Sequence, residues 1–231
     1  TALAQADLDD LQKNSFLNEI QFTAEDGKPL VISTSRPELL PACVALFVNK
    51  QDKRYKHLLG KKATVPLFHY TVPILADDRV DMEFGTGLMM VCTFGDAEDI
   101  ERWRTHKLHT RIILDKHGLL NSTAGNYQGL RCEEARKRII EDLKQAHFLK
   151  NQKQITHVTN VHERCSTPIE FLIAPQWYIR LLDIKKELLA IAKKINWHPE
   201  HMKVRYDHWV ENLKWDWCIS RERFYGVPFP V

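Results

Sequence analysis

The first 95 residues contain a succession of short apolar or β-branched runs, each about as long as a β-strand. Turn-forming residues separate the runs, among them Asp26-Gly27, Pro41, Pro66 and Pro73. Runs of this length, bounded by Gly and Pro, are typical of strands and leave little room for long helices. The segments are IQFTA, LVISTS, CVALFV, KATVPLF, TVPILA and LMMVCTF. The first part of the chain is therefore predicted to form a sheet.

Helical spacing appears only after these runs. The segment GDAEDIERWRTHK predicts a helix that is capped by Asp96 and turns Ile100 and Trp103 toward the core. The segment RCEEARKRIIEDLKQAHF predicts a clearer helix, because its apolar residues recur on one face. The residues of that face are Ala135, Ile139, Leu143 and Ala146.

Composition changes near residue 150. Five of the six tryptophans lie beyond it, after the polar stretch KNQKQITH. Two further apolar stripes with helical spacing follow, one from Ile184 to Ile195 and one from Met202 to Leu213. We therefore predict an α+β chain with two parts, residues 1–155 and residues 156–231.

Charge and cysteine content narrow the class of protein. Lys and Arg exceed Asp and Glu by three, an excess that permits a nucleic-acid partner without requiring one. No apolar run approaches the roughly 20 residues of a membrane helix, and no basic-then-apolar leader suggests secretion. The five scattered cysteines contain no Cys-x-x-Cys pair, which indicates reduced thiols. We expect a cytoplasmic protein without a membrane partner.

The motif TSRPE combines several groups that bind anions. Thr34 and Ser35 place hydroxyls at a strand end, Arg36 offers a rigid fork of donors, and Pro37 fixes the turn. Such a cluster suits a phosphate or the edge of a ribose. An ordinary capped turn with a solvated arginine explains the same residues, so both interpretations are open.

The stretch EFGTGLMMVCTFGDAED delivers a strand to a glycine and then to two acids. Gly95 permits an abrupt turn, after which Asp96 and Asp99 fall on one face of the first helical turn. Paired carboxylates beside a glycine-lined wall suit a cationic group such as an α-ammonium. A metal is less well supported, because no His or third acid stands at ligand spacing. Helix capping explains Asp96 completely and, on spacing alone, is the simpler interpretation.

The motif HERC places His162 and Cys165 at the spacing of half a structural zinc site. A closed zinc site needs four ligands, and the other cysteines are not placed to complete it. A surface histidine with a buried cysteine is the simpler interpretation. The sequence also lacks a phosphate-binding P-loop, a dinucleotide fingerprint and a nucleophile elbow, and no Ser/His/Asp or Cys/His set is evident.

Taken together, four segments resemble the valyl-tRNA synthetase family, and more narrowly its archaeal-type members. Isoleucyl relatives usually carry Thr-Pro-Trp where this chain has Arg36-Pro37-Glu38, so they rank second. The chain lacks the HIGH-type and KMSKS-type signatures with which class I synthetases bind ATP. The resemblance is therefore to the inserted editing domain, with the tail from about residue 160, including ISRERFYGVPFP, as the connection to the catalytic domain. The four segments are STSRPELLPACVALFV, VDMEFGTGLMMVCTFGDAED, HERCSTPIEFLIAPQWYI and WHPEHMKVRYDHWVENLKWDWCISRERFYGVPFP.

This resemblance implies a barrel-like mixed sheet with flanking helices and a helical C-terminal connection. It implies hydrolysis of mischarged threonyl-tRNA(Val) after transfer, without a cofactor; ATP would serve only the full-length ligase. The implied partners are the 3′ acceptor end of tRNA(Val) and the rest of the synthetase chain. The rivals are an isoleucyl editing domain and a module that binds the acceptor end without hydrolysing it.

The resemblance also implies roles for single residues. Asp96 matches the anchor of the substrate amino group, and Asp99 matches the acceptor of the threonine hydroxyl. Arg36, beside Thr34 and Ser35, matches an arginine near the tRNA end. A ribose hydroxyl of the terminal adenosine is implied to position or activate the water.

Of the other positions in the implied pocket, one matches the family pattern and the rest depart from it. Phe84 matches a wall of the pocket. Met90 stands where many bacterial enzymes have Lys, and Cys92-Thr93 stands where they have Thr-Pro. A donor to the substrate is then lost, or is supplied by Thr93 or a backbone N–H.

The resemblance finally changes the interpretation of HERC. In relatives, two cysteine pairs form a zinc ribbon at the root of the insertion. His162 and Cys165 would be half of it, and their partners would belong to the full-length enzyme. We expect this chain alone to hold no stoichiometric zinc.

Overall fold

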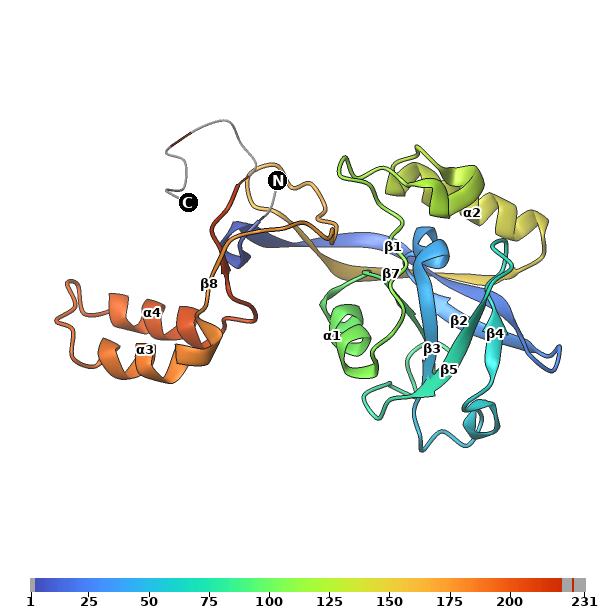
Figure 1. Cartoon of the computed structure of the whole chain (residues 1–231), viewed down its shortest axis with the longest axis horizontal. Coiled ribbons are helices and arrows are strands. Elements are labelled where there is room, and N and C mark those ends of the chain that lie inside the picture. Colours follow the sequence, from blue (N-terminus) through green and yellow to red (C-terminus); the bar gives the residue numbers. More distant parts are fainter. Residues whose placement is uncertain (1–2, 222–225, 227–231) are drawn as a thin grey trace. The chain divides into compact units, whose positions relative to one another are not determined.

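The computed structural model describes residues 3–221 and Gly226, which group into two compact units (Figure 1). The sheet unit comprises Gln12–Val158 and Glu170–Leu172. The helical unit comprises the residues up to Leu11, Thr159–Ile169 and those from Ile173 on. The division predicted from the sequence, into an editing domain of residues 1–155 and a connecting segment of residues 156–231, is a division by function and stays a prediction. Most of the segment ISRERFYGVPFP lies outside the described residues.

One mixed sheet contains seven strands in the order β2-β1-β4-β5-β3-β6, with β7 paired to β1. The pairing of β3 with β5 is parallel, and β1 with β2, β1 with β4, β4 with β5 and β3 with β6 are antiparallel. Strands β2 and β6, at the two ends of the order, lie against each other, so the sheet curls into a barrel-like form. The predicted α+β class with a barrel-like mixed sheet is confirmed. The strands are β1 (Leu8–Ala24), β2 (Pro29–Thr34), β3 (Cys43–Val48), β4 (Lys62–Thr64), β5 (Thr71–Ala76), β6 (Leu88–Cys92) and β7 (Leu149–His162).

Every predicted run contains a strand, but one is shorter than expected. In KATVPLF the strand β4 covers only Lys62–Thr64. Pro66 has no N–H to offer a neighbouring strand. Leu67 then adopts a left-handed conformation with φ of 65°, as the chain turns back toward β5.

The polar stretch KNQKQITH, where a boundary near residues 150–160 was predicted, lies within strand β7, and the two compact units divide just after it, between Val158 and Thr159. Strands β7 and β1 run side by side as a long ribbon (Figure 1). Side-chain hydrogen bonds join residues whose numbers rise in β7 as they fall in β1, so the pairing is antiparallel. The bonded pairs are Gln152 and Asn18 at 2.8 Å, Thr156 and Asn14 at 2.9 Å, and Asn160 and Asp10 at 2.6 Å.

Strand β3 is central to the core. All six of its residues are buried, which fits its uninterrupted apolar run. Leu46 and Val48 pack in the main core cluster, whereas Ala45 and Phe47 pack in a second cluster on the opposite face. The main cluster also takes the alternating inward residues of β1 and β2, such as Phe22.

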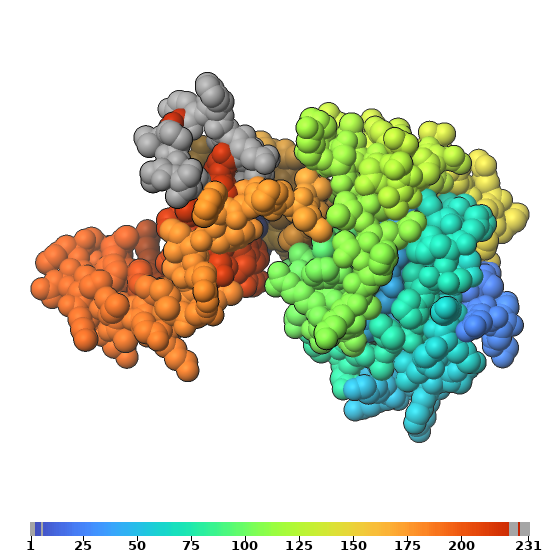
Figure 2. Space-filling view, in the orientation of Figure 1, coloured from blue at the N-terminus to red at the C-terminus, as the bar shows by residue number. Residues whose placement is uncertain are grey.

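Within the described residues, the sheet unit contains the α-helices α1 (Ala97–His106) and α2 (Cys132–Gln145), and the helical unit contains α3 (Lys185–Ala192) and α4 (Met202–Glu211). The segment from α1 to α2, coloured green, covers part of the sheet unit on the face drawn in the space-filling view (Figure 2). None of the helices in the described part of the chain has the length and apolar character needed to span a membrane. Short elements are the 3₁₀ turns η1 (Gln5–Asp7), η2 (Pro37–Ala42), η3 (Lys56–Leu58), η4 (Ser122–Tyr127) and η5 (Leu182–Ile184), and the strand pair β8 (Tyr178–Ile179) and β9 (Trp217–Cys218).

The predicted inward face of α2 is confirmed except at its end. Ala135, Ile139 and Leu143 are fully buried, whereas Ala146 is exposed because it lies just beyond the last helical turn. The predicted face of α1 is wrong: Asp99 and Arg102 are buried, and Ile100 and Trp103 are only half-buried. Helix α1 packs through these polar side chains and also through the rings of Trp103 and His106, which lie against Phe94 and Phe47. Its apolar spacing did not indicate its most buried residues.

We predict that Ile139→Ala lowers the free energy of unfolding by about 2–5 kcal/mol, because it removes a fully buried side chain from the contact between α2 and the sheet. Exposed Lys137, in the same helix, is the matched control, and Lys137→Ala should change stability by less than about 0.5 kcal/mol. Denaturant unfolding measures both values. Equal stabilities of the two variants would contradict the packing described for α2.

Candidate functional site

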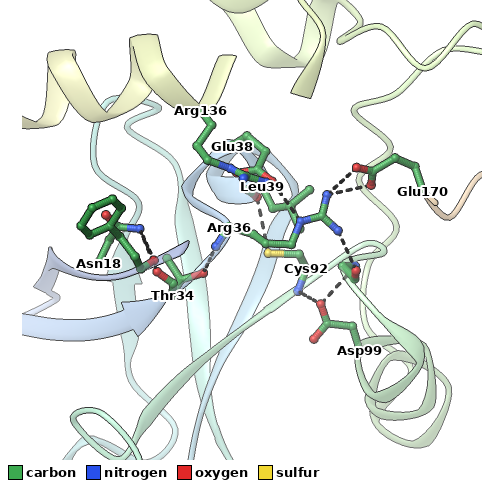
Figure 3. A network of polar contacts seen from close by, with 11 residues as sticks. Asn18, Thr34, Arg36, Glu38, Leu39, Cys92, Asp99, Arg136 and Glu170 are labelled. Carbon is green, nitrogen blue, oxygen red and sulfur yellow. Dashed lines mark hydrogen bonds and ion pairs between the residues drawn. The ribbon is translucent and has the colours of Figure 1, made fainter. Parts of the chain in front are cut away.

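The two motifs singled out in the sequence meet where β2 and β6 end. TSRPE closes β2 and opens η2, and GDAED links β6 to α1. Because β2 and β6 lie against each other, the two segments are neighbours although they are about 60 residues apart. Hydrogen bonds join them directly: Arg36 Nη1 donates to the carbonyl oxygen of Gly95 at 3.0 Å, and the Cys92 thiol donates to that of Leu39 at 3.4 Å (Figure 3).

Asp96 caps α1 and is exposed. Its Oδ1 accepts the backbone N–H of Asp99 at 2.8 Å, which is the geometry of a helix N-cap. The capping interpretation of the sequence is thus present in the structure. Asp96 thus stands exposed at the positive end of the helix dipole, and within the described residues its second carboxylate oxygen has no hydrogen bond.

Asp99 lies in a different environment from Asp96. Its side chain is 5% exposed, and its Oδ2 accepts the backbone N–H groups of Cys92 at 3.2 Å and Gly95 at 3.1 Å. Burial raises the pKa of Asp99 to about 8, and the nearby charge of Asp96 adds to this, although the two N–H groups oppose it. A Cβ at position 95 would meet Asp99 Oδ2 at 2.4 Å, so only glycine fits there.

Arg36 is engaged by protein groups on three sides (Figure 3). Its Nε donates to Glu38 at 2.9 Å, its Nη1 donates to Gly95, and its Nη2 lies 2.8 and 2.7 Å from the two carboxylate oxygens of Glu170. The side chain is 25% exposed. Arg36 is therefore not the solvated arginine of an ordinary turn.

Glu38 is fully buried and is shared by two arginines. Arg136, from α2, donates to its oxygens at 2.8 and 2.7 Å, opposite the bond from Arg36. Burial opposes the charge of Glu38, yet its pKa is lowered, because Arg136 and Arg36 donate to it and attract it. The four side chains Arg36, Glu38, Arg136 and Glu170 carry two positive and two negative charges.

The hydroxyl of Thr34 stabilises the turn itself. Its Oγ1 accepts the backbone N–H of Arg36 at 3.1 Å, and its carbonyl oxygen accepts from Asn18 Nδ2 at 3.1 Å. Asn18 is buried in β1 and also accepts from Gln152 of β7. The turn is thereby attached to both strands of the ribbon, and Ser35 lies half-buried beside it.

The residues expected along the pocket divide into exposed and buried ones. Phe84 is 61% exposed on the loop before β6, and Met90 is half-buried against the main core cluster. Cys92 is buried, and burial raises the pKa of its thiol. Thr93 is also buried, and its Oγ1 accepts the backbone N–H of Arg111 at 3.3 Å. Cys92 and Thr93 thus support the fold of the site, and Phe84 offers an apolar surface to solvent.

Sequence reasoning missed four partners of this site: Asn18, Glu38, Arg136 and Glu170. Glu38 belonged to a quoted motif, but only as part of a turn. Glu170 is 134 residues from Arg36, and no spacing rule connects the two. A partly buried arginine needs acceptors, but the burial of Arg36 is known only from the structure, so the sequence carried no signal for these partners.

His162 and Cys165 lie together in the helical unit, with Nδ1 and Sγ 3.2 Å apart. Cys165 is exposed, so the sequence interpretation of a buried cysteine is wrong. Hydrogen bonding with Thr167, and then with His162, lowers the pKa of Cys165 to about 7. Among the described residues, no three or more His, Cys, Asp or Glu side chains gather where they could hold a metal. These residues therefore do not by themselves form a closed zinc site, which needs four ligands.

Comparison with known proteins places the chain. The family model for class I tRNA synthetases (I, L, M and V) matches residues 1–231. The valine–tRNA ligase of Thermoplasma volcanium is 50% identical over 231 residues, which are all of this chain and 29% of that protein. The valine–tRNA ligase of Rickettsia conorii is 50% identical over 232 residues, again with all of this chain and 29% of that protein.

The chain thus spans less than a third of the length of the curated relatives it matches. A solved ternary complex of an Agrobacterium radiobacter leucyl-tRNA synthetase with tRNA aligns with a TM-score of 0.47 and 16% identity, over 77% of this chain and 28% of that one. Because the family model and the half-identical ligases cover the whole chain, it belongs to the class I tRNA synthetases and, within them, groups with the valine–tRNA ligases.

Proposed function

We propose that this chain is the editing part of a valine–tRNA ligase and hydrolyses threonyl-tRNA(Val) after transfer. The observation that carries the proposal is the contrast between two acids at the start of α1: Asp96 is exposed, and Asp99 is buried three residues later. A hydrophobic pocket cannot strongly reject an isostere that merely adds a hydroxyl, and valyl enzymes are the standard example. A second, polar site is therefore needed.

Asp96 is the proposed anchor of the substrate ammonium. The side chain is exposed at a helix N-terminus, where the N–H of Asp99 fixes Oδ1, and the second oxygen is the proposed acceptor for the ammonium. A charge-assisted hydrogen bond from an ammonium to this oxygen is stronger than one between neutral groups. Every aminoacyl ester carries this ammonium, so Asp96 would serve all substrates alike.

Asp99 is the proposed partner of the threonine hydroxyl. Its Oδ2 is held by two backbone N–H groups, which fixes the direction of the carboxyl group. Because it is buried, an apolar valine side chain placed against it would leave a polar group without a partner. Sites that hydrogen-bond a substrate hydroxyl discriminate strongly against analogues that lack it.

Hydrolysis of the ester requires few further catalytic groups from the protein. An aminoacyl ester is already activated, so holding the ester and one water in line can supply much of the acceleration. A ribose hydroxyl of the terminal adenosine is the proposed group that positions or activates the water. Thr34, Ser35, Arg36 and Phe84 would border the tRNA end, with Met90, Cys92 and Thr93 lining or supporting the pocket. The proposed partners are the acceptor end of tRNA(Val) and the rest of a synthetase chain, in the cytoplasm.

A binding module without hydrolysis is the second candidate. It is favoured by the structural tasks of both acids, since Asp96 caps α1 and Asp99 accepts two backbone N–H groups. Incubating the chain with threonyl-tRNA(Val) and following loss of the ester separates the two functions. A rate no faster than in buffer would reject the hydrolase. Faster hydrolysis of valyl-tRNA(Ile) than of threonyl-tRNA(Val) would favour the isoleucyl alternative.

We predict that Asp96→Asn is stable but loses hydrolysis of both threonyl- and valyl-tRNA. Asparagine keeps a capping oxygen, so the free energy of unfolding should change by only a few tenths of a kcal/mol, whereas Asp96→Ala should cost about 1 kcal/mol. Single-turnover deacylation and denaturant unfolding measure the two effects. Glu101→Gln removes an exposed charge from the same helix and is the control. A stable and fully active Asp96→Asn chain would leave Asp96 with capping alone.

Asp99→Ala should affect discrimination between substrates. We expect hydrolysis of threonyl-tRNA to fall roughly tenfold to a hundredfold, as for a hydroxyl left without its partner, with a much smaller change for valyl-tRNA. The ratio of kcat/KM values for the two esters is the measurement. A proportional loss on both esters would assign Asp99 to the fold of the site rather than to the hydroxyl.

The raised pKa of Asp99 predicts a pH dependence of stability. Between pH 3.8 and about 8 the folded chain keeps a proton that the unfolded chain releases, so this contribution to stability is lost as pH rises toward 8. Asp99→Asn, which cannot titrate, should lack that loss. Unfolding free energies of both chains from pH 5 to 9 test this. Parallel curves over this range would contradict it.

A further inference from the structure

We propose that Glu170 is a positioning residue for the acid pair and acts through Arg36. The inference rests on the function proposed above for Asp96 and Asp99. Both carboxylate oxygens of Glu170 lie within 2.8 Å of Arg36 Nη2. The two side chains are only 22% and 25% exposed, so the ion pair is partly shielded from water.

Glu170 belongs to a short segment of the sheet unit whose neighbours in the sequence belong to the helical unit. Residues 170–172 group with the sheet unit, whereas Thr159–Ile169 and the residues from Ile173 on group with the helical unit. The backbone N–H of Ile169, next to Glu170, bonds to the carbonyl oxygen of Asn160 in the helical unit. The ion pair with Arg36 is therefore a contact within the sheet unit, to which Glu170–Leu172 belong.

The contact continues from Arg36 to the two acids. Arg36 Nη1 donates to the carbonyl oxygen of Gly95, and the N–H of Gly95 donates to Asp99 Oδ2 (Figure 3). Gly95 directly precedes Asp96. Gly95, in the turn between β6 and α1, is thus held at its carbonyl by Arg36 and at its amide by Asp99. Its position therefore helps to set the direction of both acids, together with the bonds from Cys92 to Asp99 and from Asp99 to Asp96.

Charge balance makes Glu170 necessary for this arrangement. Glu38 accepts hydrogen bonds from both Arg36 and Arg136. If Glu170 were absent, Glu38 would be the one carboxylate that balances these two guanidinium groups. Without Glu170 the cluster would carry two positive charges and one negative charge. Arg36 Nη2 would lose its protein acceptors and turn toward water, which loosens the bond from Nη1 to Gly95.

We expect Glu170→Ala to lower kcat for threonyl-tRNA roughly tenfold or more, since small misplacements of positioning groups have effects of this size. KM should stay within about twofold, because the variant disturbs alignment rather than tRNA contact. Glu170→Gln keeps an acceptor and should lose less. Glu163→Ala, which removes an exposed glutamate paired with Arg164, is the matched control and should be unaffected.

A second measurement does not depend on activity. Amide hydrogen exchange at Gly95, followed by NMR, should become faster in Glu170→Ala, while exchange in the core of the sheet unit stays unchanged. In an Arg36→Leu background, Glu170→Ala should have no further effect on either measurement, because both residues act in one chain of contacts.

Unchanged kcat and unchanged Gly95 exchange would overturn the inference. So would an undiminished effect in the Arg36→Leu background, or a change in KM alone, which would place Glu170 in tRNA binding. If the unaltered chain hydrolyses no ester, the proposed function fails. Gly95 exchange then still decides whether Glu170 positions this segment.

Discussion

The pairing of buried charges around Arg36 is the interaction on which the site depends. A guanidinium that is only 25% exposed needs acceptors, and three segments provide them: the start of η2, the turn before α1, and the chain beyond β7. Glu38 extends the cluster to α2 through Arg136. Each charge is tolerable in the interior only because the others compensate it. The cluster thus fixes the relative positions of segments that no local rule would bring together.

Differences in burial also give two side chains of the same type different properties. Asp96 and Asp99 lie in one helical turn, yet one carboxylate is solvated and the other is removed from water. The exposed acid suits a permanent charge on a ligand. The buried acid, whose pKa is raised to about 8, suits a neutral hydroxyl, because a carboxyl group near its pKa can donate or accept a hydrogen bond. In the proposed function, discrimination between amino acids would follow from these environments rather than from residue type.

Structural and functional tasks are combined in the same groups. The oxygen of Asp96 that caps α1 also orients the carboxylate for its proposed ligand, and the N–H groups that stabilise Asp99 also fix its direction. Asn18 connects the TSRPE turn to the ribbon of β1 and β7. A substitution in this network therefore has to be judged by stability and by chemistry together.

The sequence alone determined the strands of the barrel-like sheet other than β7, the inward face of α2 through Ile139, and the cap at Asp96. These features depend on local spacing: apolar runs between Pro and Gly, a stripe of period 3.6, and an acid before a helix. The resemblance carried by the motifs also indicated the family.

Tertiary structure alone decided the rest. Strands β1 and β7 form a ribbon although many of their residues are polar, because the backbone N–H and C=O groups of each strand can pair with those of the other. This pairing does not require a buried apolar face. Helix α1 buries Asp99 and Arg102 because polar partners lie there: the backbone N–H of Cys92 for Asp99, and the carboxylate of Asp77 for Arg102. Glu170 pairs with Arg36 although the two are 134 residues apart in the sequence. An ion pair depends on the distance between the charges in space, and it produces no periodic pattern in the sequence from which it could be predicted.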